Sequence, residues 1–447
     1  MRILIVAYEF PPSPSPQSLR WAYLSREMAS LGHEVHVLAP ALPGDGAGLP
    51  ALGSGVRLHR TSAGPIMGFV ARRARNTAGR QPPALVPGQV DEARLQQLVL
   101  DKPVAGLNWK GRLFQRIKTV AGALRYPDIR GEWTPVARRK LPELIEQLRP
   151  QVVVTSHEPA STLALGQQAK KLGIPWVADL GDPVLAAYTP WRWRARARAT
   201  ERSAWGQADA VAVTTEATRC LLEQRHGPAR GRCVTLPQGY DAGVARAGDP
   251  LAELFDPARL ELLYTGSFYR FRQPAALVEA VLATPGVRLS IGSMQVPASI
   301  KAHAARHPDK LRLLGFLRHT DALLLQRAAD VLVNIANTDP AQVPGKFHEY
   351  LGSGRPILHI GTSRSDHSAE LLHRAGAGWV CENDAPRVIA ALTALRDARE
   401  SGRLGAELAR DEAIVQPYRW DSIALAYADL LMEVAERAEG THGAPTP

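Results

Sequence analysis

Two successive series of short apolar runs, alternating with stretches of helical length, constrain the fold of this chain more than any other feature. The first series opens with a run at residues 3–7, an amphipathic stretch at 19–31 and a second run at 35–38. Uninterrupted apolar runs are typical of strands buried on both faces of a parallel sheet. A strand–helix–strand unit of this kind needs a right-handed crossover, so the pattern predicts an α/β fold with doubly wound parallel sheets.

The same alternation continues along most of the chain. In the first half it predicts further strands at 152–155, 175–179 and 210–214, with helices at 159–171 and 196–207. In the second half it predicts six strands, at 262–264, 287–291, 311–313, 331–334, 357–359 and 378–381. Because 447 residues are too many for one core, we expect two Rossmann-like domains, at 1–240 and 241–416. A terminal helix at 417–436 and a disordered tail at 437–447 should follow.

Basic residues are concentrated in the first half of the chain. The formal net charge is +11, and residues 57–150 carry 18 Lys and Arg against 7 Asp and Glu. We expect residues 40–136 to form an irregular basic insertion, since Gly and Pro clusters interrupt the periodic patterns there. A local excess of this size attracts acidic lipid headgroups or phosphorylated acceptors. The segment WRWRARAR at 191–198 pairs aromatics with arginines, as interfacial segments do; a solvated basic face is the alternative.

Composition disfavours several classes of protein. No apolar run reaches the roughly 18 residues that a membrane span needs, and the run at 3–7 leads into Glu9 and prolines, unlike a secretion signal. The three cysteines lack the spacing of a metal site, and their odd number argues against a disulfide framework. We therefore expect a cytoplasmic protein that contacts the acidic inner face of the cell membrane through its basic segments. No nucleic-acid partner is expected, because no nucleic-acid-binding motif is present.

The stretch PGKFHEYLGSGRP at 344–356 carries the clearest chemical pattern. A Pro-Gly pair opens a short helix, and Gly354 followed by Pro356 ends it. Lys346 and Glu349 are three positions apart, so their side chains emerge side by side near a helix N-terminus that attracts phosphate. Lysine suits a phosphate group, and a glutamate can accept from two ribose hydroxyls. The alternative is a surface ion pair, worth less than about 1 kcal/mol.

Four segments in this order resemble glycosyltransferase family 4. They are the opening MRILIVAYEFPPSPSPQSLRWAYLSREMASLGHEVHVLAP, then LLYTGSFY, LLGFLRHTDALLLQRAADVLVNIA and PGKFHEYLGSGRPILHI. The resemblance implies a GT-B fold of two facing Rossmann-like domains, with a C-terminal helix that returns to the N-terminal domain. It also implies a retaining transferase that takes its sugar from a nucleotide-diphosphate donor and uses no metal or other cofactor.

The resemblance also assigns the donor side to the second domain. Lys346 and either Arg270 or Arg272 should hold the diphosphate, next to the small residues Gly266 and Ser267. Loop solvation is the alternative for the two arginines. Phe316 and Leu317 should contact the nucleobase through their backbone, and Glu349 the ribose. Relatives commonly carry a further acid where this chain has Ala341; Asp339 would have to replace it.

The first domain should supply the acceptor side. In the family, a histidine at the edge that His157 occupies faces the donor sugar. Asp182 fits a role in the cleft, whereas Asp179 fits a helix-capping role. Glu9, which follows the first strand, should border the acceptor. His157, Arg270, Lys346 and Asp182 are therefore the expected catalytic residues, and no metal-ligating group is expected.

The leading hypothesis is a retaining glycosyltransferase that extends a glycan or a lipid-linked acceptor in cell-surface polysaccharide biosynthesis. One alternative is a degenerate protein of the same fold that binds nucleotide-sugars without turnover, since an acid is missing at Ala341. A second is a nucleotide-sugar epimerase of the same fold. A nicotinamide dehydrogenase is disfavoured, because the first strand leads into prolines instead of a Gly-x-Gly-x-x-Gly turn.

Overall fold

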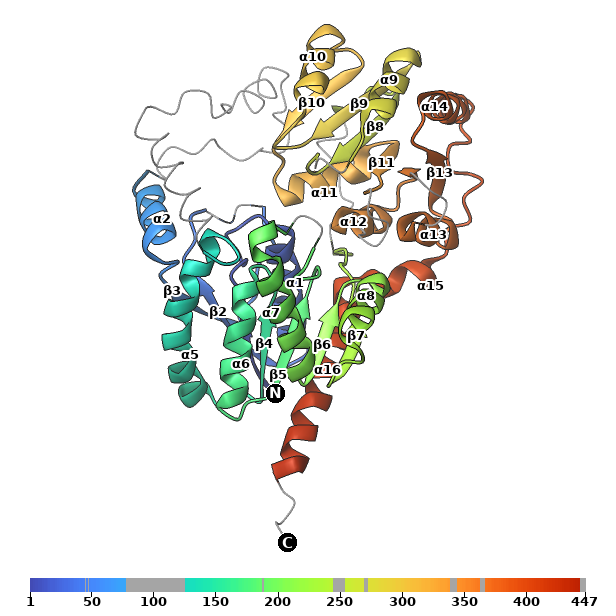
Figure 1. Ribbon diagram of the computed structural model, residues 1–447. Helices are drawn as coiled ribbons and strands as arrows, with labels where there is room; N and C mark the ends of the chain where they lie inside the picture. Colours follow the sequence, from blue (N-terminus) through green and yellow to red (C-terminus); the bar gives the residue numbers. More distant parts are fainter. Residues whose placement is uncertain are drawn as a thin grey trace. The chain divides into compact units, whose positions relative to one another are not determined.

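The computed structural model describes residues 1–44, 46, 48–77, 125–186, 189–243, 254–268, 272–337, 344–361 and 366–442 (Figure 1). These residues divide into two units. Unit 1 contains the described residues up to Gln238 together with those from Trp420 onward, and unit 2 runs from Gly239 to Arg419. Arg270, Asp339 and Ala341 lie outside the described residues, so the predictions that concern them stay predictions. None of the described helices combines the length and apolarity that crossing a bilayer requires.

Unit 1 is built on a seven-stranded sheet with the order β3-β2-β1-β4-β5-β6-β7 and parallel pairing throughout. Its strands are β1 (Arg2–Val6), β2 (Glu34–Pro40), β3 (Val56–Thr61), β4 (Val152–Ser156), β5 (Trp176–Leu180), β6 (Ala210–Val213) and β7 (Arg232–Thr235). The central strand β1 pairs with β2 through Ile3 and Val35, and with β4 through Ile3 and Val152. Successive strands are therefore added on one side of β1 as far as β3 and on its other side from β4 onward. Open parallel sheets bind ligands at such a switch point, here between β1 and β4.

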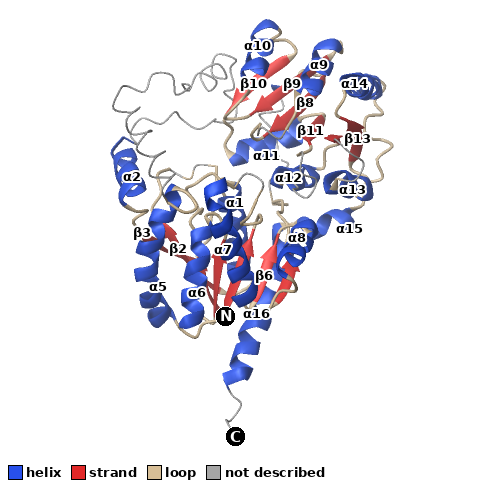
Figure 2. Cartoon of the chain, in the orientation of Figure 1, coloured by secondary structure: helices blue, strands red, loops and turns tan. Residues whose placement is uncertain are grey.

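Helices flank this sheet, as Figure 2 shows. They are α1 (Pro16–Ser30), α2 (Pro65–Thr77), α5 (Thr134–Leu148), α6 (Leu163–Lys171), α7 (Arg194–Gln207), α8 (Glu216–His226) and α16 (Trp420–His442), with 3-10 turns η2 (Ile129–Trp133), η3 (Ala160–Thr162) and η4 (Trp191–Trp193). Helix α1 begins where the sequence provides a start signal. The Ser15 side chain accepts from the backbone N–H of Ser18, and Pro16 occupies the first turn.

Part of the predicted irregular insertion at 40–136 is regular, which corrects that expectation. Residues Val56–Thr61 form the edge strand β3, paired with β2, and Pro65–Thr77 form α2. The sequence of β3, VRLHRT, alternates with polar residues because an edge strand is covered on fewer sides. It therefore lacks the apolar run that identifies a central strand. Residues 78–124 lie outside the part of the chain that the structure describes.

The terminal helix α16 returns to unit 1, as the family resemblance implies. It packs against α1, and Trp420, Ile423 and Tyr427 belong to the core that includes Trp21. The rings of Trp21 and Tyr427 meet edge to face at 5.8 Å. The helix continues to His442, so the predicted boundary at residue 436 is too early, and residues 437–442 are helical rather than a disordered tail.

Unit 2 is built on a six-stranded parallel sheet with the order β10-β9-β8-β11-β12-β13. Its strands are β8 (Leu260–Thr265), β9 (Val287–Gly292), β10 (Leu311–Gly315), β11 (Val331–Ile335), β12 (Ile357–Gly361) and β13 (Gly378–Glu382), so all six predicted strands are confirmed. Its helices are α9 (Ala275–Ala283), α10 (Ala298–Arg306), α11 (His319–Ala328), α12 (Gly345–Ser353), α13 (His367–Arg374), α14 (Ala385–Glu400) and α15 (Glu412–Val415). Two apolar cores cover the two faces of the sheet. The order of strand addition switches sides between β8 and β11, and this switch point again marks a ligand-binding place at the carboxyl ends of the strands.

Candidate functional site

In unit 2, the candidate site lies at the carboxyl end of β8, beside the switch point of the sheet. Gly266 follows β8 with φ +103°, a conformation that favours glycine. A Cβ atom added there would meet the Lys346 side chain at 3.4 Å. The glycine therefore provides both the turn and the space in which the Lys346 side chain lies against the backbone.

Lys346 extends from the first turn of α12 back to the end of β8. Its Nζ atom donates to the carbonyl oxygen of Thr265 at 2.8 Å and lies 3.4 Å from the centre of the Tyr264 ring. Burial, reinforced by the nearby Arg272 guanidinium, lowers the pKa of Lys346 well below its usual value. The side chain is thus held over the strand end and is weakly solvated. An anion that binds beside it would raise its pKa and favour the protonated amine.

Arg272 lies in the same place, but its side chain is 8% exposed and does not extend into solvent as loop solvation would require. Its Nε atom donates to Asn337 Oδ1 at 2.8 Å, and Nη1 donates to the carbonyl oxygen of Ser267 at 2.9 Å. These bonds fix the guanidinium beside the backbone of residues 266–267. The structure therefore brings Gly266, Ser267, Arg272 and Lys346 together, and Arg270 is outside the described residues.

Glu349 is held one turn further along α12. Gln326 of α11 donates from Nε2 to Glu349 Oε2 at 3.4 Å and to Thr265 Oγ1 at 3.2 Å. Tyr350 places its hydroxyl 2.8 Å from the backbone nitrogen of Thr265. Lys346 and Glu349 thus bond to different partners in one partly buried network, which argues against the simple surface ion pair.

Gln326, Thr265 and Tyr350 escaped the sequence analysis. One signal was present: Gln326 interrupts an apolar helix face, and a buried amide in such a position needs partners. The partners themselves lie 61 and 23 positions away along the chain, so local spacing gave no access to them.

The two residues expected beside the nucleobase differ in exposure. Phe316 is 52% exposed, whereas Leu317 packs partly buried against the core of unit 2. Leu317 occupies the space over Gly292, where an added Cβ would come within 2.4 Å of it. An exposed aromatic ring next to the turn is available to a ligand, and Leu317 sets the position of that turn.

In unit 1, Glu9 and His157 lie just past the carboxyl ends of the neighbouring strands β1 and β4. Glu9 accepts from Ser13 Oγ at 2.7 Å and from Arg130 Nη1 at 3.2 Å. His157 is buried, and burial together with the Arg130 charge lowers its pKa to about 4. Its imidazole is therefore neutral near pH 7 and able to accept or donate one hydrogen bond.

Arg130 organises this edge and was also missed by the sequence analysis. It binds Asp128 at 2.8 Å and lies 3.8 Å from Glu158 in addition to Glu9. Burial raises the pKa of Glu158, although the Arg130 charge opposes the shift. Arg130 is therefore surrounded by three carboxyl groups, those of Glu9, Asp128 and Glu158.

The expected helix-capping role of Asp179 is wrong. Asp179 is buried at β5, where Oδ2 accepts from Arg20 Nη2 at 2.9 Å and from the Tyr427 hydroxyl at 3.2 Å. Arg20 also donates to the carbonyl oxygens of Leu236 and Pro237. Asp179 therefore joins four segments of unit 1. Asp182, two residues beyond β5, is half-buried at the same sheet edge.

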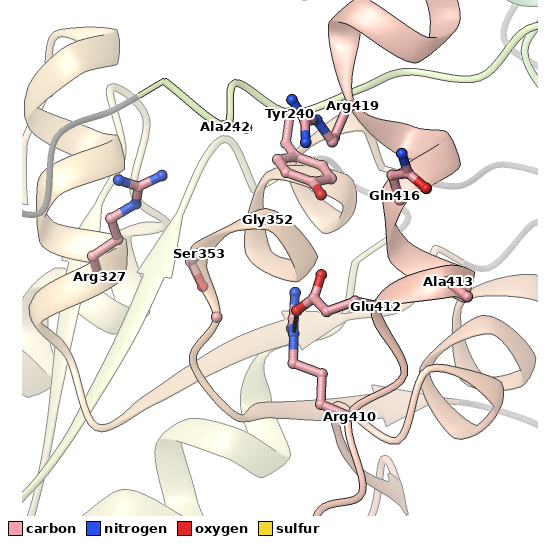
Figure 3. A pocket seen from close by; sticks show the side chains of 11 residues that line it. Tyr240, Ala242, Arg327, Gly352, Ser353, Arg410, Glu412, Ala413, Gln416 and Arg419 are labelled. Atoms are coloured by element: carbon pink, nitrogen blue, oxygen red, sulfur yellow. Dashed lines mark hydrogen bonds and ion pairs between the residues drawn. The ribbon is translucent and has the colours of Figure 1, made fainter.

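A separate pocket of about 670 Å³ lies at the other end of α12, lined by Gly352, Ser353 and Gly354 together with residues of the segments around 240 and 410–419 (Figure 3). It does not include Lys346 or Glu349. In the described ranges, His, Cys, Asp and Glu side chains form no group of three or more that suits a metal ion.

Comparison with known proteins gives concordant results. Residues 17–239 match the family model of the Glycosyl transferase 4-like domain. None of the curated proteins compared with the chain matches it.

Solved structures resemble the chain over nearly its whole length. Sucrose-phosphate synthase from Thermosynechococcus elongatus has a TM-score of 0.67 at 15% identity, covering 97% of this chain and 99% of its own. HepE from Anabaena, solved in complex with UDP, has a TM-score of 0.59 at 13% identity, covering 97% and 100%. A putative UDP-N-acetylglucosamine 2-epimerase from Listeria monocytogenes has a TM-score of 0.51 at 14% identity, covering 96% and 94%. With two doubly wound parallel sheets and a matching family domain, the chain has the GT-B fold and belongs to the glycosyltransferases that resemble family 4.

Proposed function

We propose that this protein transfers a sugar from a nucleoside-diphosphate donor to a glycan or lipid-linked acceptor, with retention of anomeric configuration. The observation that carries the proposal is the partly buried network joining Lys346, Thr265, Gln326 and Glu349, which presents a cation and a carboxylate at the ligand-binding end of the unit 2 sheet. Structures of HepE with UDP and with UDP-glucose support a donor of this class. Extension of a cell-surface polysaccharide is the role that we propose for the product.

The roles of the donor-side residues follow from their chemistry. Lys346 and Arg272 take the diphosphate, with Gly266 and Ser267 allowing its close approach. Glu349 accepts from the ribose hydroxyls, and the turn at Phe316 and Leu317 borders the base. Arg270 and Asp339 remain proposed contacts of the diphosphate and the sugar.

In the proposed reaction, the acceptor oxygen attacks the anomeric carbon from the face that the diphosphate leaves. The bond between that carbon and the phosphate oxygen breaks with its electron pair going to the phosphate, and the acceptor proton passes to the same oxygen. Lys346 and Arg272 stabilise the charge that develops there, which is the largest catalytic effect available without a nucleophile. His157 and Asp182 contact the reacting sugar and acceptor, and Glu9 binds an acceptor hydroxyl.

A panel of nucleotide-sugars tests this function. We expect release of the nucleoside diphosphate with one class of donor in the presence of a matched acceptor, and unchanged turnover after EDTA treatment, since we propose that no metal or cofactor takes part. Interconversion of the nucleotide-sugar without an acceptor would favour the epimerase instead, for which the Listeria structure is the specific support. Donor binding without either reaction would favour a degenerate binding protein.

Replacement of Glu349 by alanine should remove the preference of the enzyme for a ribose donor over a 2′-deoxyribose donor. The carboxylate accepts from hydroxyls that a 2′-deoxy donor lacks in part, so the wild type should prefer the ribose form by about tenfold or more, the equivalent of one charge-assisted hydrogen bond. Comparison of kcat/KM for the two donors measures it. In Glu349→Ala the two values should be nearly equal; a preference that persists in the variant would place the ribose elsewhere.

We also propose contact with an acidic membrane surface through η4 and the start of α7. Trp191 is 84% exposed, and Arg192, Arg194, Arg196 and Arg198 are exposed along the same segment. The single acid in α7, Glu201, is buried and bound to His226 and Arg225. The segment follows β5, so it lies at the same end of the sheet as His157 and Glu9, where the strands have their carboxyl ends. Such contact would keep a cytoplasmic enzyme at the inner face of the membrane, near a lipid-linked acceptor.

Vesicle sedimentation tests this contact. Because each basic residue near an anionic surface contributes about 1 kcal/mol, replacing Arg194, Arg196 and Arg198 by glutamine should weaken binding to phosphatidylglycerol vesicles by about 100-fold. Binding to pure phosphatidylcholine should be weak for both proteins. A matched variant with exposed arginines of unit 2 replaced, Arg306, Arg387 and Arg403, should bind as the wild type. Equal losses in both variants would mean that net charge alone drives binding.

A further inference from the structure

The pocket at the carboxyl end of α12 has a composition that points to a ligand of its own. Three arginines reach it from separate segments: Arg327 from the end of α11, Arg410 from the chain before α15, and Arg419 from the chain before α16 (Figure 3). Tyr240 closes one side, and the pocket volume of about 670 Å³ lies within the range of roughly 300–1,000 Å³ found for small-molecule sites.

Basic side chains outnumber acidic ones among the residues that line the pocket. Glu412 is the single acid among its lining residues, and it binds Arg410 at 2.5 Å while remaining 69% exposed. Two carbonyl groups in the last turn of α12 are also occupied: Arg410 Nη2 donates to Leu351 O at 2.6 Å, and Ser353 Oγ donates to Tyr350 O at 2.7 Å. Arg327 also has a partner, since its Nη2 atom donates to the carbonyl oxygen of Asp241 at 3.5 Å. Three guanidinium groups and one carboxylate therefore line the pocket, and this excess of basic side chains favours an anion.

We propose that this pocket binds a phosphorylated polyol of monosaccharide size. Arginine matches the paired oxygens of a phosphate group, and Arg327 and Arg419 supply that geometry from two sides. The Tyr240 hydroxyl and the Gln416 amide can bond to the hydroxyls of the sugar. The site is distinct from the donor site, since Lys346 and Glu349 do not line it.

Helix α12 connects the pocket to the donor site within unit 2. It has nine residues, with Lys346 and Glu349 in its first half and Gly352 and Ser353 at the pocket. Tyr240 packs so closely on Gly352 that an added Cβ would lie 2.1 Å from its ring. A ligand that moves Tyr240 or Arg410 therefore acts on the end of α12. The bound phosphate should change donor affinity by about fivefold or more, and the donor should change phosphate affinity by the same factor; this coupling rests on the proposed function.

Calorimetric titration with glucose 6-phosphate, inorganic phosphate and glucose tests the site. Because a phosphate could also enter the donor site, the titrations use the full chain and four variants: Arg327→Gln, Arg419→Gln, Lys346→Met and the exposed α10 control Arg306→Gln. We expect glucose 6-phosphate to bind the wild type, Arg306→Gln and Lys346→Met alike, and at least tenfold more weakly to Arg327→Gln and Arg419→Gln. Glucose should not bind.

The outcomes separate this proposal from the proposed function. Loss of glucose 6-phosphate binding in Lys346→Met alone would place the phosphate in the donor site and overturn the inference. Equal binding in all variants, or none to the wild type at millimolar concentration, would also overturn it. UDP titration checks the donor site independently: its affinity should fall in Lys346→Met and persist in Arg327→Gln. If the protein binds glucose 6-phosphate in the pocket but transfers no sugar, the pocket proposal stands and only the proposed transferase function is refuted.

Discussion

Replacement of Lys346 by methionine should lower kcat/KM for sugar transfer by about 10²–10³-fold, the usual cost of removing one preorganised group that stabilises developing negative charge. Methionine keeps most of the unbranched apolar stem of the side chain but removes the ammonium group that lies over the Tyr264 ring. The effect should appear in kcat as well as in KM, because the leaving phosphate gains charge in the transition state. Steady-state kinetics with the best donor of the panel measures both.

The proton balance of donor binding gives a second readout for the same residue. Burial and Arg272 hold the pKa of Lys346 below its usual value in the free protein, and a diphosphate beside the amine should raise it. Binding should therefore take up a proton, and donor affinity should fall as pH rises above the pKa of the free protein. Calorimetry in buffers of different ionisation enthalpy measures the uptake.

Two comparisons test the assignment of Lys346. Lys301→Met, which alters an exposed lysine on α10 of the same unit, should leave both kinetics and proton uptake unchanged. Proton uptake that persists in Lys346→Met would assign it to another group, and an unchanged kcat/KM would show that the diphosphate binds elsewhere.

Replacement of Asp179 by alanine should destabilise unit 1 by about 3–5 kcal/mol, the cost of leaving one member of a buried ion pair without its partner. The Arg20 and Asp179 side chains are 0% and 1% exposed, so water cannot replace the lost carboxylate. The Tyr427 hydroxyl loses its acceptor as well. Hydrogen exchange of peptides from α1 and β5 measures the free energy of unfolding of this unit by itself.

Two controls distinguish the loss of the buried Arg20–Asp179 ion pair from the loss of any one negative charge. Glu143→Ala removes an exposed acid that binds Lys140 on α5, and it should change stability by less than about 1 kcal/mol. The double variant Arg20→Met and Asp179→Leu should recover part of the loss, because an apolar pair leaves no buried charge, although the carbonyl groups of Leu236 and Pro237 still lose their donor. A small effect of Asp179→Ala would mean that Arg20 reaches another acceptor after the change.

The sequence predicted what depends on local periodicity. The central strands of both sheets bury both faces, so their apolar runs identified them, and the spacing of Lys346 and Glu349 on α12 placed both on one helix. The edge strands β3 and β7 were missed because each is partly exposed and carries polar residues among its apolar ones. Contacts between distant segments were also out of reach. Arg20 and Asp179 are 159 positions apart, and an arginine in an amphipathic helix is ordinarily read as a surface residue.

The return of α16 to unit 1 determines the order in which the two units can be completed. The described residues of unit 2 run from Gly239 to Arg419, whereas the core around Trp21 also needs Trp420, Ile423 and Tyr427. On the ribosome, the described residues of unit 2 are therefore all synthesised before the last segment of unit 1, although unit 1 begins first. Until α16 emerges, α1 exposes the apolar surface that this helix covers, and the nascent chain must be protected there from aggregation.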